Sequence, residues 1–126
     1  MSKKDISKKI LLAEDEVFLA RTFEVMLEKE GYKVTKVTDG LQALEELEKK
    51  EYGLLMLDLI MPKMDGFDVL ERLYEKQNTT PIIVISNLGQ KEDFERVKSF
   101  GVKKFFIKSN TSIKDVIKVV KSMTKE

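Results

Sequence analysis

The chain has 126 residues, a length that fits one globular domain with a sizeable buried core. Its 23 basic and 22 acidic residues give a net charge of +1, which excludes a strong overall attraction to nucleic acid or an anionic membrane. It contains no cysteine and no histidine, so disulfides, thiolate or imidazole metal sites and phosphohistidine chemistry on this chain are excluded. Neither a signal peptide nor an apolar run of membrane length is present, and we expect a cytoplasmic protein with no membrane partner.

Short apolar runs alternate with amphipathic stretches along the chain, the pattern of repeated β-α units. The runs at 8–13, 53–58 and 81–86 are continuous, as in central parallel strands covered on both faces, whereas 33–38 alternates and predicts an edge strand. The residues before the first run are expected to lead directly into it. In chain order, the sequence predicts strand 8–13, helix 16–30, strand 33–38, helix 40–50, strand 53–58, helix 66–76, strand 81–86, helix 90–100, strand 104–108 and a helix from 112.

Local signals support several helix boundaries. Gly31 ends the first helix, Asp39 is a predicted N-cap for the second, and Ser112 caps the last one. The helix at 66–76 is expected to turn one apolar face inward, formed by Phe67, Leu70, Leu73 and Tyr74. These elements predict an α/β fold with a single doubly wound sheet of five parallel strands and five helices.

Polar side chains follow four of the predicted strands at the point where each strand ends. Glu14 and Asp15 follow the first strand, Asp58 and Ser86 close the third and fourth, and Lys108 follows the fifth. In an open parallel sheet, ligands bind beyond the carboxyl ends of the strands. Clustered carboxylates repel one another and need a cation, and oxygen ligands suit Mg²⁺ better than a soft metal.

Each of these residues also has an ordinary interpretation when it is considered alone. Asp58 could be a loop residue or a helix cap, and Glu14 with Asp15 could favour the positive end of the first helix. Ser86 could be a turn hydroxyl and Lys108 a solvated charge. Their joint placement at one sheet edge favours a shared site.

Asp58 also begins a specific sequence motif. Residues 58–66 read Asp-Leu-Ile-Met-Pro-Lys-Met-Asp-Gly, a D-x-x-M-P-x-M-D-G run. With the acidic pair, Ser86 and Lys108, this run closely resembles the receiver domain of two-component response regulators over essentially the whole chain. The resemblance implies the flavodoxin-like strand order 2-1-3-4-5 and one receiver domain over residues 1–126, with no output domain on this chain.

The resemblance also implies the chemistry of the site. Asp58 would be the phosphoacceptor, forming an acyl phosphate with a phosphoryl group from a partner phosphohistidine. Mg²⁺ would be held mainly by Asp15, with Asp58 and the backbone carbonyl of Ile60, while Glu14 acts through coordinated water. The protein would catalyse only its own phosphorylation and dephosphorylation, and so would not be an enzyme acting on other substrates.

Three further residues would connect phosphorylation to a change in shape. Lys108 would pair with phosphoryl oxygens, and Ser86 would donate a hydrogen bond to one of them. Phe105 matches the aromatic position that changes rotamer with this shift. The signalling surface would comprise helix 90–100, strand 104–108 and the last helix.

The chain departs from the family pattern after two of these residues. Ser109 stands where a proline with a cis peptide is usual, and a cis non-proline bond costs about 3–4 kcal/mol, which favours a trans peptide and a differently shaped loop. Asn87 stands where a small residue is usual and is expected to narrow access to the phosphoryl group. Ile60 and Leu88 are apolar where water would approach, so we predict a long-lived phosphoryl group.

Partners follow from the resemblance and from charge. A sensor histidine kinase or histidine phosphotransfer protein is expected to dock near helix 16–30 and the site. The helices at 90–100 and from 112 carry lysines that we interpret first as a solvated surface, with docking of an acidic partner or a second receiver as the alternative. These lysines are Lys91, Lys98, Lys114, Lys118, Lys121 and Lys125.

Other functions fit the residues less well. An aspartate-nucleophile phosphatase of the haloacid dehalogenase type needs a second aspartate two residues after the first, but position 60 is isoleucine. A flavodoxin is disfavoured because acidic residues after the first strand would repel the flavin phosphate. A receiver fold that serves only as an interaction module, without phosphorylation, is disfavoured by the acidic pair after the first strand, by Asp58 and by Lys108, whereas Asn87 and Ser109 keep it open.

Overall fold

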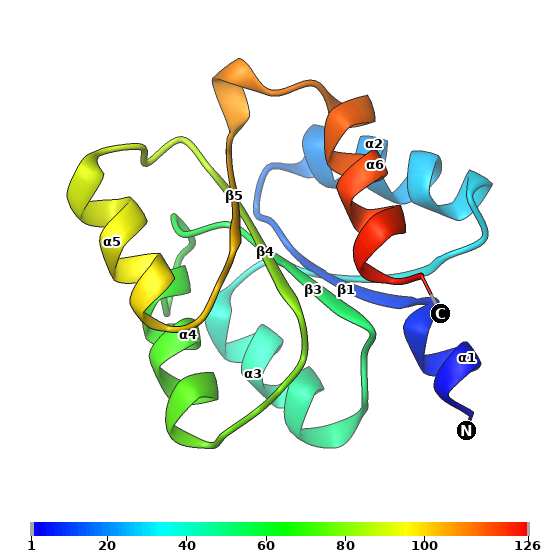
Figure 1. The fold of residues 1–126 in the computed structure, drawn as a ribbon, viewed down its shortest axis with the longest axis horizontal. Helices are drawn as coiled ribbons and strands as arrows, with labels where there is room; N and C mark the ends of the chain where they lie inside the picture. Colours follow the sequence, from blue (N-terminus) through cyan, green and yellow to red (C-terminus); the bar gives the residue numbers. More distant parts are fainter. Residues whose placement is uncertain (1, 126) are drawn as a thin grey trace.

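Five parallel strands form the sheet at the centre of the computed structural model, which describes residues 2–125 (Figure 1). The strand order is β2-β1-β3-β4-β5, so β2 and β5 lie at the two edges. The predicted α/β fold, strand order and edge position of residues 33–37 are therefore confirmed. The strands are β1 (Lys9–Ala13), β2 (Lys33–Val37), β3 (Leu54–Leu57), β4 (Ile82–Ser86) and β5 (Lys104–Ile107).

The helices follow the strands in alternation, with one addition at the start of the chain. Ser2 caps a short helix there by accepting a hydrogen bond from the Asp5 N–H at 3.2 Å, so these residues do not lead directly into β1 as predicted. Residues 2–125 thus contain six α-helices where five were predicted, and a turn of 3-10 helix follows β5. The helices are α1 (Lys3–Ser7), α2 (Val17–Lys29), α3 (Gly40–Lys49), α4 (Gly66–Glu75), α5 (Lys91–Ser99), η1 (Lys108–Asn110) and α6 (Ile113–Met123).

The helices cover both faces of the sheet in two layers (Figure 1). Successive residues of a strand point to opposite faces, so Leu55 and Leu57 pack with α3, α4 and α5, while Leu54 and Met56 pack with α2 and α6. All four residues of β3 are buried, which explains its continuous apolar run. Within residues 2–125, the structure contains no helix that combines the length and apolar character needed to cross a membrane.

The layer around α4 and α5 differs from the prediction at one residue. Phe67, Leu70 and Leu73 of α4 are buried as predicted, but Tyr74 is 61% exposed. Tyr74 lies at the margin of the apolar face, where its ring meets Phe100 edge-on at 5.8 Å between ring centroids. Periodicity alone could not reveal that the neighbouring helix leaves this margin uncovered.

Candidate functional site

The register of the parallel strands determines which side chains meet at the carboxyl edge of the sheet. Ala13 of β1 pairs with Leu57 of β3, and the Asp58 N–H donates to the Ala13 carbonyl at 3.1 Å. Glu14 and Asp58 therefore leave neighbouring strands at the same level. In the β4–β5 pair, Ser86 is the partner of Ile107, so Lys108 follows directly after the end of the sheet.

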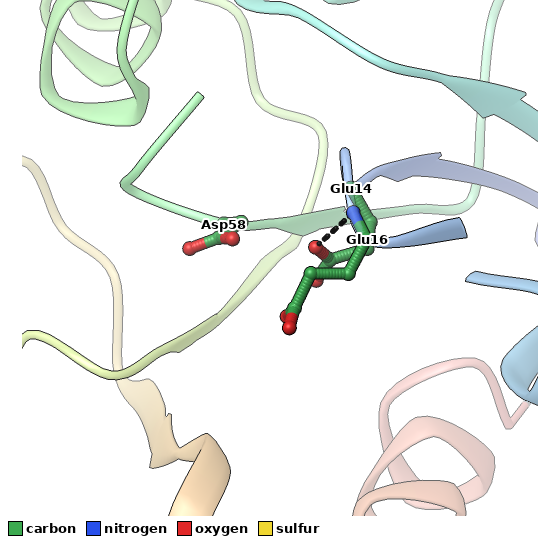
Figure 2. Close-up of side chains that lie close together, drawn as sticks. All are labelled: Glu14, Glu16 and Asp58. Carbon is green, nitrogen blue, oxygen red and sulfur yellow. Dashed lines mark hydrogen bonds between the residues drawn. The ribbon is translucent and has the colours of Figure 1, made fainter. Parts of the chain in front are cut away.

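Three carboxylates form a cluster at this edge. Glu14, Glu16 and Asp58 each offer an oxygen, and these oxygens lie within 4.8 Å of one another. Figure 2 shows the three side chains, with the Glu16 N–H donating to the Glu14 carboxylate at 3.0 Å. Glu14 and Asp58 are only 3% and 4% exposed, whereas the Glu16 side chain is 58% exposed.

The Lys108 ammonium lies among these carboxylates. Its Nζ is 2.8 Å from Asp58 Oδ2 and 2.8 Å from Glu14 Oε1, and it also pairs with Glu16. Burial alone lowers the pKa of Lys108, but hydrogen bonds to Asp58, Glu14 and Glu16 outweigh it and raise the pKa above its usual value. Lys108 is therefore charged, and it compensates part of the buried negative charge.

The cluster keeps an excess of negative charge, because three carboxylates face one ammonium. Burial raises the pKa of Glu14 to about 7, against the opposing hydrogen bonds from Lys108 and the Glu16 N–H. Hard oxygen donors with uncompensated charge are the ligands that Mg²⁺ prefers. The residues present thus fit a magnesium ion.

The loop after β3 holds Asp58 in place. The Ile60 N–H donates to Asp58 Oδ1 at 3.1 Å, and the Gly66 N–H donates to the Leu59 carbonyl at 2.9 Å. A Cβ atom on Gly66 would lie 2.5 Å from the Asp58 carbonyl oxygen, so only glycine allows this approach. Asp65 caps α4 by accepting the Asp68 N–H at 2.9 Å, and the Asp58 backbone therefore rests on a well-defined turn.

Ser86 and Phe105 lie on the outer side of the site. Ser86 is fully buried at the end of β4, and its hydroxyl oxygen accepts the Leu88 N–H at 3.4 Å. Phe105 is half-buried in β5, and its ring packs on Phe94 of α5 with 4.4 Å between centroids. Leu88 itself is half-buried and packs on the core. Phe105 thus connects the strand that precedes Lys108 to helix α5.

The two departures from the family pattern lie side by side. Residues 2–125 contain no cis peptide bond, so the Lys108–Ser109 bond is trans, and these residues begin the turn η1. Asn87 is exposed, and its Oδ1 accepts the Ser109 N–H at 3.1 Å.

The carboxylate cluster differs in composition from the predicted ligand set. Glu14 and Asp58 meet, but Asp15 is exposed and is not one of the three clustered acids, although it lies at the same sheet edge. Glu16 was not predicted. Its position as N-cap of α2, third in the acidic run Glu14–Glu16, was the available signal, because a long side chain at the first turn can reach back toward the strand end.

The sequence model of the response regulator receiver domain matches residues 10–121. The chain therefore belongs to the response regulator receiver family, the receiver domains of two-component signalling. This is the family that the motif at Asp58 indicated.

Curated relatives include both short and long proteins. The chain is 30% identical to the chemotaxis protein CheY of Treponema pallidum over 103 residues, which cover 79% of this chain and 72% of that protein. It is 38% identical to the probable transcriptional regulator ycf27 of Cyanophora paradoxa over 86 residues, 68% of this chain and 36% of that protein. It is 30% identical to the transcriptional regulatory protein PdtaR of Mycobacterium tuberculosis over 116 residues, 91% of this chain and 56% of that protein. The chain thus spans about a third to just over half of these two regulators.

Solved structures of receiver domains share the fold. The receiver domain of the Francisella response regulator 1452 has a TM-score of 0.87 at 28% identity, with 94% of this chain and 97% of that one covered. The receiver domain of the sensor histidine kinase PA1611 of Pseudomonas aeruginosa has a TM-score of 0.82 at 26% identity, with 94% and 98% covered. In that protein a magnesium ion is coordinated in the active-site cleft.

Proposed function

We propose that this chain accepts a phosphoryl group on Asp58 from a phosphohistidine of a histidine kinase or histidine phosphotransfer protein. A carboxylate oxygen of Asp58 attacks the phosphorus atom, the new P–O bond forms as the P–N bond to the imidazole breaks, and the imidazole leaves with the electron pair. The observation that carries the proposal is the buried Asp58 carboxylate at the sheet edge, 2.8 Å from the Lys108 ammonium.

The acidic residues at this edge would hold Mg²⁺. The clustered oxygens of Asp58, Glu14 and Glu16 support this assignment, and Asp15 and the Ile60 carbonyl are proposed as further ligands, with Glu14 acting through water. When bound, the ion neutralises charge on the phosphoryl oxygens. Magnesium in the cleft of the related kinase receiver supports the same assignment.

Lys108 and Ser86 would respond to the phosphoryl group. Lys108 already touches the Asp58 oxygen, so its ammonium is placed to pair with phosphoryl oxygens. The Ser86 hydroxyl would donate to one of them, which draws the loop after β4 inward. Phe105 would change rotamer with that movement, and its packing on Phe94 would carry the change to the α5-β5-α6 surface.

The residues around Asp58 would determine how easily water reaches a phosphoryl group on its carboxylate. Ile60 is 52% exposed beside the site, Leu88 is half-buried, and Asn87 is exposed at the end of β4. Apolar Ile60 and Leu88 give water few hydrogen-bonding partners, which favours a long-lived acyl phosphate. The protein would catalyse only its own phosphorylation and dephosphorylation.

Docking of the phosphodonor protein is proposed at the start of α2. Val17 and Phe18 are 74% and 89% exposed there, directly after Glu16 of the carboxylate cluster. Exposed apolar side chains beside a reacting group suit a transient protein contact. The lysines of α5 and α6 are proposed first as a solvated surface, with a receiver homodimer or an acidic partner as the alternative, and we expect these encounters in the cytoplasm.

The test is incubation with a small phosphodonor such as phosphoramidate and Mg²⁺, followed by intact mass measurement. We expect a gain of one phosphoryl group, absent in Asp58→Asn. Asp68→Asn is the matched control, because Asp68 is an exposed acid in the first turn of α4, and it should be phosphorylated normally. An unchanged wild-type mass would favour an interaction module, and turnover of many donors without labelled protein would favour an enzyme.

A further inference from the structure

The loops after β4 and β5 stay in contact beyond the last paired residues of these strands. Ser86 and Ile107 form the final pair of the β4–β5 ladder. One step further, Asn87 Oδ1 accepts the Ser109 N–H at 3.1 Å. A side chain thus replaces the backbone as acceptor, and the connection between the two strands extends to the residue after Lys108.

A second contact shows how closely the loops approach. A Cβ atom on Gly89 would lie only 2.7 Å from Cδ1 of Ile107. The loop after β4 therefore lies close to Ile107 of β5 at Gly89, and at Asn87 it is hydrogen-bonded to Ser109 of η1. One close approach and one hydrogen bond thus place this loop beside the segment that carries Lys108.

The hydrogen bond between Asn87 and Ser109 joins the two residues that depart from the family pattern. A proline at position 109 would have no backbone N–H, so it could not donate to Asn87. A small residue at position 87, which is usual in the family, would offer no side-chain acceptor. Ser109 and Asn87 together make possible an interaction that neither of the usual residues allows.

We propose that Asn87 is a positioning residue for Lys108, acting through the backbone N–H of Ser109. This inference rests on the proposed function of Lys108 as the residue that pairs with the phosphoryl group. Ser86 precedes Asn87 and Lys108 precedes Ser109, so the hydrogen bond joins the residues that directly follow the two groups expected to contact the phosphoryl oxygens. The bond limits how far the backbone of Lys108 can move from the backbone of Ser86, which differs from a role in restricting access to the phosphoryl group.

The first experiment uses the unphosphorylated protein and measures Ser109 amide exchange and the Lys108 side-chain signals by NMR. Asn87→Ala should speed Ser109 exchange by about three- to tenfold, the range expected for one neutral hydrogen bond, and should shift the Lys108 signals. Asn87→Asp retains an acceptor oxygen and should keep Ser109 protected. Asn110→Ala is the matched control, because Asn110 is exposed on the same turn, and both readouts should stay as in the wild type.

The second experiment measures the rate constant of phosphorylation by phosphoramidate in a double-mutant cycle. Asn87→Ala should lower this rate constant by about three- to tenfold in the wild-type background and leave it unchanged in a Ser109→Pro background, which has no N–H to donate. Faster phosphorylation of Asn87→Ala would overturn the proposal and would show that Asn87 restricts access to Asp58. An equal fall in both backgrounds would also overturn it, because the effect of Asn87 would then not depend on the Ser109 N–H.

The two experiments separate this inference from the proposed function. If the wild type takes up no phosphoryl group, the proposed function fails, while unchanged Ser109 exchange in Asn87→Ala would overturn the hydrogen bond between the loops. Because Asn87 is exposed, its replacement should leave the fold intact, which far-UV circular dichroism checks.

Discussion

The centre and the outer edge of the sheet contribute differently to the site. All four residues of β3 are buried, and Asp58 follows them directly. All four residues of β5 remain partly exposed, and Lys108 follows those. The proposed acceptor therefore follows a fully buried strand, whereas two of the proposed responding groups, Phe105 and Lys108, lie in or directly after a partly exposed edge strand with room to repack. This difference suits a protein in which phosphorylation of a rigidly held aspartate changes the conformation of a more mobile surface.

A pair of substitutions, one in each strand, tests this difference most directly. Leu55→Ala in β3 should lower the free energy of unfolding by about 4 kcal/mol, because Leu55 is fully buried and its removal leaves a cavity. Ile107→Ala in β5 should cost only about 1 kcal/mol, since Ile107 is half-buried. Urea unfolding of both variants measures the two values. Equal losses would show that the edge is packed as firmly as the centre.

Lys108 joins the two regions, and its removal tests that connection. Lys108→Met should destabilise the metal-free protein by about 3 kcal/mol, because two buried carboxylates lose their cationic partner. Added Mg²⁺ should restore part of the loss by compensating the same charge. Thermal unfolding with and without Mg²⁺ measures both effects. Lys104→Met is the control, since Lys104 is exposed in the same strand, and a loss as large there would contradict the explanation.

Two neighbouring acids test which residue supplies the metal ligand. We expect Asp15→Asn to weaken Mg²⁺ binding by about tenfold and Glu16→Gln by about threefold, because the longer Glu16 side chain loses more freedom when fixed and already pairs with Lys108. Isothermal titration with Mg²⁺ measures both constants. If Glu16→Gln has the larger effect, Glu16 is the more important ligand. The ion would then be bound by the clustered acids of the structure, and not mainly by Asp15 as the family resemblance implies.

The smallest expected effect concerns the outer edge alone. Phe94→Ala removes the ring that packs on Phe105, yet Phe94 is 39% exposed, so the free energy of unfolding should fall by only about 1 kcal/mol. Amide exchange should quicken in β5 and α5 and remain unchanged in β1 and β3. Hydrogen-exchange mass spectrometry measures this distribution. Faster exchange in β3 as well would show that the edge and the centre open together.

The amino-acid sequence alone was enough to predict the alternation of strands and helices from β1 onward and the edge of the sheet at which the site lies, although helix α1 was missed. Continuous apolar runs identify strands that are buried on both faces, and the carboxyl ends of parallel strands must share one edge. Asp39 and Ser112 cap their helices as predicted, because an N-cap hydrogen bond joins residues three positions apart, which the sequence displays directly.

Which side chains meet at that edge became known only from the folded structure. The contacts of Lys108 with Glu14 and Asp58 join residues 94 and 50 positions apart, and the Asn87–Ser109 hydrogen bond joins residues 22 apart. Such contacts depend on the path of each loop and on the reach of each side chain. For the same reason, although the acidic run Glu14–Glu16 marks Glu16 as a candidate, only the turn into α2 decides that Glu16 joins the cluster and that Asp15 does not.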